Sequence, residues 1–167
     1  MTQNRTLSLI LPAFGAAIIA ALAQIVIPIG AVPITLQTFA VGPLAATLYL
    51  ILGAIGLPVF AGGGGGLQAF FGPSAGYLLA YPFFALVTSA LAHAKTPIWK
   101  IFLAFVLGDA LVFVGGILSL HFLGKMGWSA AVAVGLTPFI IPDLLKGLIV
   151  ALVTKPVLKA LKNHSYF

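Results

Sequence analysis

The sequence predicts an all-α fold, an integral membrane bundle of six transmembrane helices, and three observations support this prediction. Apolar residues make up 62% of the chain and charged residues only 6%, whereas a soluble domain has roughly 25% charged residues. The apolar residues form long runs, and a membrane-spanning helix needs about 20 of them. Such a bundle uses almost all 167 residues, so we expect residues 1–167 to form a single transmembrane domain without a soluble catalytic domain.

The basic residues predict the topology of the bundle. The net charge is +6, but the cations stand singly between apolar runs and form no stripe of the kind that binds nucleic acid, so we expect no nucleic acid partner. Cytoplasmic loops of membrane proteins are enriched in Lys and Arg. We therefore predict cytoplasmic N- and C-termini, and a C-terminal helix that meets anionic membrane lipids. Arg5 precedes the first span, and Lys95 and Lys100 share one loop. Three further cations lie near the C-terminus: Lys155, Lys159 and Lys162.

The residues from Leu7 to Ile29 are almost all apolar and predict the first transmembrane helix. A secretory signal peptide is the alternative, because small residues near its end resemble a cleavage site. Ala13, Ala17 and Ala21 recur at every fourth position and therefore lie on one face of the helix. Since small residues let another helix approach closely, this face predicts either packing within the bundle or docking to another membrane protein.

Polar side chains open the next apolar stretch, which follows a break at Pro28–Pro33. Gln37 is one of them and is a candidate for contact with a ligand. Polar residues near a helix start more often cap the helix or form hydrogen bonds to a neighbouring helix, so both interpretations of Gln37 stay open.

The length of residues 34–56 conflicts with the charge pattern. These residues are enough for one membrane crossing, which would place the loop around Lys95 and the C-terminal lysines outside the cell, against the positive-inside rule. Two crossings would return both regions to the cytoplasm, but they need about 40 residues. We therefore predict either a re-entrant region or, as the preferred hypothesis, that part of a helix pair is missing from the sequence near Gly42.

A glycine-rich stretch predicts a long loop after this region. Five consecutive glycines, Gly62–Gly66, cannot hold a helix cheaply, and loops of such length are usually functional or disordered. Phe60 is unusual in a solvated linker. We interpret this glycine-hinged loop as a lid over a binding site, in which Gly62 and Gly63 are candidates for contact with the substrate, and a passive interfacial loop is the alternative. No Gly-Lys-Ser/Thr sequence follows, so the loop does not match an ATP-binding phosphate loop.

Two more spans are predicted at Ala75–Ala94 and Ile98–Leu123. Tyr77 lies near the start of the first, beside the predicted lid, and is either a site residue or an interfacial aromatic residue. Asp109 lies near the middle of the second. Because a carboxylate in lipid is costly, Asp109 should face the bundle interior, in a structural pair or in contact with a substrate.

The last span begins at Pro142 and places two ionisable residues at its head. Asp143 and Lys146 are three residues apart, so their side chains share one face of the helix. Proline is accommodated in a first helical turn, and the positive end of the helix dipole favours an ionised Asp143. Ionisable groups in a membrane span usually face the interior or a cavity. We therefore expect these two residues to pair or to hold a polar ligand between them.

The same residues limit which chemistry the chain can carry. It has no cysteine, and its histidines lack partners at metal-ligand spacing, so we expect no metal site. An intramembrane enzyme that uses Asp109 and Asp143 as a carboxylate pair is an alternative function. Lys146 would neutralise Asp143, however, and we find no catalytic motif, so we do not expect an enzyme.

Four motifs follow one another in a fixed order: VPITLQT at 32–38, GLPVFAGG at 56–63, GPSAGYL at 72–78 and PDLLK at 142–146. Together they resemble BioY, the family of biotin-binding S components of energy-coupling-factor (ECF) vitamin transporters. The resemblance implies a biotin site near the outer surface of a prokaryotic plasma membrane. It also implies association with one coupling membrane protein and two ATPase subunits, which hydrolyse ATP, so no cofactor is expected in this chain.

The resemblance also implies roles for single residues. The family uses Asp143 and Lys146 around biotin, whereas Gln37 and Tyr77 are candidates for neutral hydrogen bonds and Phe60 for an apolar wall. The family docks to its partner through an alanine stripe such as that of Ala13, Ala17 and Ala21. Two departures stand out: Thr38–Gly56 leaves space for one helix where the family has two, and a glycine is missing between Pro142 and Asp143. A lone secondary transporter is a further alternative.

Overall fold

The computed structural model describes residues 2–27, 34–35, 43–91 and 95–163. These ranges contain six α-helices, which confirms the predicted all-α bundle: α1 (Thr2–Ala23), α2 (Pro43–Ala54), α3 (Ala75–Leu91), α4 (Ile98–Phe122), α5 (Trp128–Gly135) and α6 (Ile140–Asn163). Two-residue strands, β1 (Val26–Ile27) and β2 (Ile34–Thr35), form a small antiparallel ladder. Two 3₁₀ turns lie in the loop between α2 and α3: η2 (Ala61–Gly63) and η3 (Leu67–Phe70).

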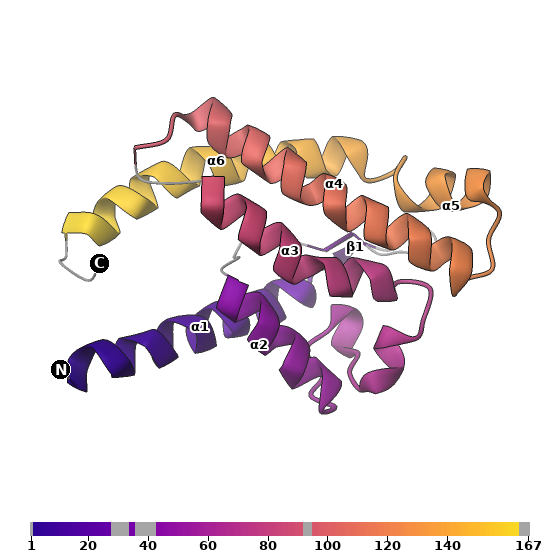
Figure 1. Cartoon of the computed structure of the whole chain (residues 1–167), viewed down its shortest axis with the longest axis horizontal. Coiled ribbons are helices and arrows are strands. Elements are labelled where there is room, and N and C mark those ends of the chain that lie inside the picture. Colours follow the sequence, from indigo (N-terminus) through magenta and orange to yellow (C-terminus); the bar gives the residue numbers. More distant parts are fainter. Residues whose placement is uncertain (1, 28–33, 36–42, 92–94, 164–167) are drawn as a thin grey trace.

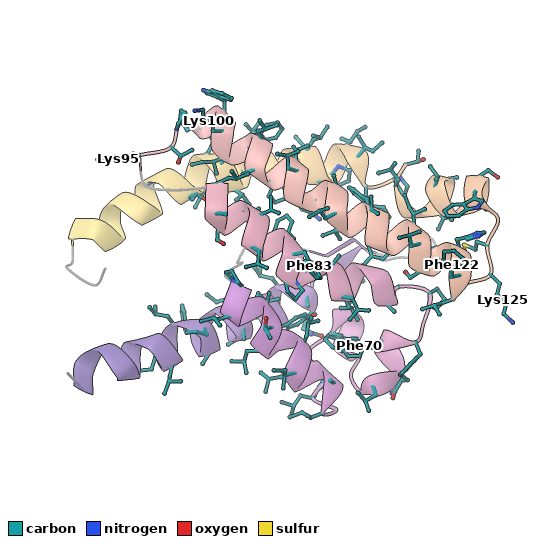
Figure 2. The ribbon with its side chains drawn as sticks, in the orientation of Figure 1. Phe70, Phe83, Lys95, Lys100, Phe122 and Lys125 are labelled. Carbon is teal, nitrogen blue, oxygen red and sulfur yellow. The ribbon has the colours of Figure 1, made fainter. Side chains whose placement is uncertain are left out.

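The helices run along the long axis of the molecule in two layers, with α1 and α2 in one and α3, α4 and α6 in the other (Figure 1). Helix α4 packs against α3, α5 and α6, and α2 joins the two layers by contacting both α1 and α3. The start of α1 and the end of α6 lie at the same end of the bundle, whereas α5 and the glycine-rich loop lie at the opposite end (Figure 1). Lys95 and Lys100 lie with the termini, and Lys125 lies far from them (Figure 2).

Large apolar side chains cover much of the outside of the bundle. Leu9 is 74% exposed, Phe14 64% and Phe83 60%. In water, apolar patches of this extent would mark interaction sites or aggregation-prone surfaces. The apolar exterior therefore fits a protein surrounded by lipid, as the sequence composition predicts.

The helices differ in their ability to cross a membrane. Helix α4 is long and apolar enough on its own, and α5 with Ile140–Thr154 passes the same test as one span bent by 43°. Three other apolar segments are shorter: Leu9–Ala23, Pro43–Ala54 and Ala75–Leu91. Helix α2 has 12 residues, well below the roughly 20 that a span needs. The predicted interruption near Gly42, directly before α2, lies outside the described residues.

Helix α1 is part of the packed interior, which favours a transmembrane helix over a signal peptide. Ala16, Ile19 and Ala23 are buried in a cluster with Tyr49 of α2 and Phe60 of the following loop. The helix ends at Ala23, earlier than predicted from the apolar run.

Helices α3 and α4 approach each other through glycines. A Cβ atom on Gly76 would overlap the carbonyl oxygen of Gly115, and one on Gly116 would overlap the ring of Tyr77. Small residues at such positions allow membrane helices to come into close contact. This contact fixes α4, which carries Asp109, against the start of α3.

We expect Gly76→Ala to destabilise the bundle by about 1–3 kcal/mol, because the new methyl group overlaps backbone that cannot move cheaply. The thermal unfolding midpoint of the purified protein in detergent should fall. Gly72→Ala is the matched control, since its Cβ would lie 3.9 Å from the nearest atom, the carbonyl oxygen of Gln68. Equal midpoints for the two variants would contradict the assigned contact.

Candidate functional site

Asp143 and Lys146 form a buried ion pair at the head of α6, as one of the two sequence-based alternatives predicts. The Lys146 ammonium lies 2.5 Å from Asp143 Oδ1, and each residue is only 8% exposed. The helix begins at Ile140, so Pro142 and Asp143 both fall in its first turn. The N–H of Asp143 donates to the carbonyl of Phe139 at 2.8 Å. The sequence at the helix start therefore fixes the backbone of the acid, and the helical spacing places Lys146 beside it.

A half-open cavity of about 170 Å³ lies between α4 and α6. Asp109 and Asp143 face it from opposite helices, and its other lining residues are apolar: Phe105, Val106, Ala110, Phe113, Ile140 and Leu144. Asp109 is only 7% exposed. Gly147, next to Lys146, allows the close approach of α6, because a Cβ there would lie 2.7 Å from the ring of Phe105. The structure thus brings both acids of the chain to one small apolar cavity.

Tyr77 supports this region from α3. Its hydroxyl donates to the carbonyl of Gly135, the last residue of α5, at 2.7 Å. Its ring centroid lies 6.4 Å from that of Phe139, which directly precedes α6. Tyr77 therefore holds the break between α5 and α6. The hydroxyl oxygen keeps the capacity to accept a hydrogen bond.

The glycine-rich loop is folded, not extended, and Phe60 at its start points inward. Phe60 is 4% exposed and makes an edge contact with Tyr49, with ring centroids 5.3 Å apart. Gly62 and Gly63 have φ of 66° and 77°, a left-handed conformation that favours glycine. Phe60 belongs to the cluster between α1 and α2 and does not line the cavity of Asp109 and Asp143. The structure therefore places the predicted lid and the two acids in different clusters.

Gln24 is a residue whose role sequence reasoning missed. Its side-chain nitrogen donates to the carbonyl of Phe60 at 3.2 Å and to that of Val59 at 3.4 Å, and so ties the loop to the end of α1. A polar residue at the end of an apolar run was the available signal. Gln37, which the sequence did single out, lies outside the described residues.

The geometry can now be compared with known proteins. Residues 1–163 match the profile of the BioY family. The chain belongs to the BioY family. It is 39% identical to the biotin transporter BioY2 of Lactococcus lactis subsp. cremoris, over 100% of this chain and 99% of the relative. It is 37% identical to the biotin transporter BioY of Thermotoga maritima, over 78% of this chain and 83% of the relative. Its fold matches a crystal structure of the S-component for biotin from an ECF-type ABC transporter with a TM-score of 0.84, 28% identity and 95% coverage of both chains.

Membership of the BioY family confirms that the chain is a membrane protein, as composition and the apolar exterior indicate. The comparison with BioY2 runs over 180 positions, more than the 167 residues of this chain, although it covers the whole chain. The relative therefore has internal residues without a counterpart here. The comparison does not give the position of these residues, so the predicted gap near Gly42 stays a prediction.

The alanine stripe of α1 faces outward in this BioY-family chain. Ala13, Ala17 and Ala21 are exposed, whereas Ala16 on the neighbouring face is 1% exposed and packs in the core. Within the described residues, the stripe therefore does not pack in the core of the bundle, and its role in docking stays a prediction.

We expect Lys146→Met to lower the free energy of unfolding by roughly 3–5 kcal/mol, because it leaves the Asp143 carboxylate buried without its cation. The double variant Asp143→Asn/Lys146→Met should recover most of this loss, since neither charge remains. Unfolding midpoints of purified protein in the absence of ligand measure both effects. Additive losses in the double variant would show that the two side chains act independently.

Proposed function

We propose that this chain is the substrate-capturing S component of an ECF-type vitamin transporter and binds biotin. Residues 1–167 would act as one transmembrane substrate-binding domain. The family, the names of the relatives and the matched S-component fold support this proposal. The observation that carries it is the buried ion pair of Asp143 and Lys146 beside a cavity, because an ionisable pair inside a membrane bundle marks a functional site.

The chemistry of biotin suits these groups. Its ureido ring offers two N–H donors and a carbonyl acceptor, its thioether ring is apolar, and its tail ends in a carboxylate. Asp143 accepts from an N–H, Lys146 donates to an oxygen, and Asp109 faces the same cavity. The cavity is smaller than the roughly 300–1,000 Å³ of typical ligand sites, so it holds part of the vitamin and the rest extends beyond it. Tyr77 and Gln37 supply neutral hydrogen bonds, and Phe60 an apolar wall.

The glycine-rich loop serves as the lid in this proposal. It lies at the end of the bundle opposite the termini (Figure 1), where substrate would arrive from outside. The left-handed residues Gly62 and Gly63 provide hinges, and Gln24 anchors the loop to α1. Closing the lid over biotin would bring Phe60 and its loop towards the acids of α4 and α6.

The orientation in a prokaryotic plasma membrane follows from the charges. Lys95 and Lys100 lie at the same end of the bundle as the start of α1 and the end of α6 (Figures 1 and 2). We propose that this end is cytoplasmic, because basic residues are enriched on the cytoplasmic side. The N- and C-termini and the basic end of α6 then meet the anionic inner leaflet.

The partners in this proposal are a coupling membrane protein and two ATPase subunits. The exposed stripe of Ala13, Ala17 and Ala21 is the docking surface, since small residues let a partner helix approach. ATP is hydrolysed by the partner subunits, so this chain is not an enzyme and needs no cofactor or metal. The described residues contain no group of three or more metal-ligating side chains.

One observation favours a second candidate, an intramembrane enzyme that uses a pair of carboxylates. Asp109 and Asp143 line a common cavity, as such an enzyme requires. The ammonium of Lys146 lies 2.5 Å from Asp143, however, and neutralises one member of the pair. We therefore favour binding over catalysis.

Two further alternatives have their own tests. Biotin uptake by cells without the ATPase module would indicate a lone secondary transporter. Tighter binding of riboflavin or thiamine than of biotin would indicate an S component for another vitamin.

We expect Asp143→Asn to weaken biotin binding by orders of magnitude, because the carboxylate that accepts from the ligand and balances Lys146 is lost. Calorimetric titration of purified, monodisperse protein measures the Kd. Lys100→Gln, which changes an exposed cation near the start of α4 that does not line the cavity, should bind biotin normally. Unchanged affinity in Asp143→Asn would remove this site assignment.

We expect Ala17→Trp to abolish assembly with the coupling protein and ATPases while biotin binding persists, because the indole blocks helix approach at the stripe. Co-purification with the tagged ATPase module measures assembly. Val114→Trp is the control, since Val114 is 56% exposed on α4, away from α1. Normal assembly of Ala17→Trp, or equal loss in both variants, would count against the docking surface.

A further inference from the structure

The charges around the α4/α6 cavity do not balance. Asp109 and Asp143 bring two carboxylates, and Lys146 brings one ammonium that is already 2.5 Å from Asp143. Asp109 has no hydrogen bond and no salt bridge with any described residue, although it is only 7% exposed and faces the cavity. If all three groups were ionised, the cavity would hold one unmatched negative charge within the bundle.

No other described charge compensates for Asp109. Helix α4 packs against α3, α5 and α6, and α5 has no ionisable side chain. The phenols of α3 are uncharged at neutral pH, and the remaining ionisable groups of α4 lie near its two ends. The groups in question are Asp143 and Lys146 on α6, Tyr77 and Tyr81 on α3, and Lys100 and His121 on α4.

An isolated carboxylate in an apolar environment is so unfavourable that such a group normally takes up a proton instead. Asp143 avoids this cost because it pairs with Lys146, whereas Asp109 has no ion pair with any described cation. We propose that Asp109 carries a proton in the empty cavity, so that its carboxyl group donates a hydrogen bond to an acceptor oxygen of the ligand. That oxygen is a carbonyl or carboxylate oxygen, and its identification with biotin rests on the proposed function.

With this assignment, the cavity and the ion pair beside it offer one group of each kind. Asp143 accepts hydrogen bonds, Lys146 donates as a cation, and Asp109 donates as a neutral acid. Loss of the Asp109 proton removes a donor and adds a negative charge that repels the carboxylate of biotin. The carboxylate of the vitamin is already ionised from mildly acidic pH upwards, so affinity should fall as the pH rises through the titration of Asp109.

The proton itself is tested without any ligand by infrared difference spectroscopy of the purified protein. The wild type should show the carbonyl stretching band of a protonated carboxylic acid, and Asp109→Asn should lack it. The double variant Asp143→Asn/Lys146→Met is the matched control and should keep the band, because it removes the ion pair without leaving an unpaired cation beside Asp109. A wild type without the band, or a band that persists in Asp109→Asn and disappears in the double variant, overturns the proposal. Because biotin is absent, failure of the proposed function does not affect this result.

The role of the donor is tested by biotin titrations from pH 6 to pH 9 with wild type, Asp109→Asn and Asp109→Leu. The wild-type Kd should rise at least tenfold over this range, and the Kd of Asp109→Asn should change less than twofold. Asparagine keeps a donor and leucine does not, so Asp109→Leu should bind at least tenfold more weakly than Asp109→Asn. Equal Kd values for the two variants, or a wild-type affinity that follows Na⁺ concentration instead of pH, would overturn the proposal.

Discussion

The buried contact between Asp143 and Lys146 is the constraint around which the rest of the bundle is arranged. Paired charges inside a protein rarely stabilise it more than apolar side chains of the same size would. The presence of such a pair inside an apolar bundle therefore indicates a functional role. The surrounding structure supports the pair: Pro142 lies in the first turn of α6, Gly147 lets α6 approach α4, and Tyr77 holds the preceding break. The cavity beside the pair follows from these contacts.

Much of this could be predicted from the sequence because each prediction rests on local spacing. The distance of three residues between Asp143 and Lys146 settles that they share a face, and the apolar runs settle the helical class. The position of Asp109 facing the interior follows from the cost of placing a carboxylate in lipid. The spacing of four residues between Ala13 and Ala17 places them on one face of the helix, but the sequence does not tell whether that face points inward.

The rest depends on contacts between distant segments, which spacing does not encode. Nothing local shows that Gln24 binds the backbone at Phe60, or that Phe60 packs against Tyr49 away from the acids. The cavity shared by Asp109 and Asp143 likewise depends on how α6 crosses α4. Phe60 therefore packs in the cluster of α1 and α2, apart from the cavity that Asp109 and Asp143 line.

The most direct test of the central claim is a structure of the protein with biotin bound. The account predicts polar atoms of biotin within about 2.7–3.2 Å of the Asp143 carboxylate or the Lys146 ammonium, with the fused rings entering the cavity between α4 and α6. Biotin bound in another part of the bundle, with the ion pair intact and out of its reach, would contradict the account.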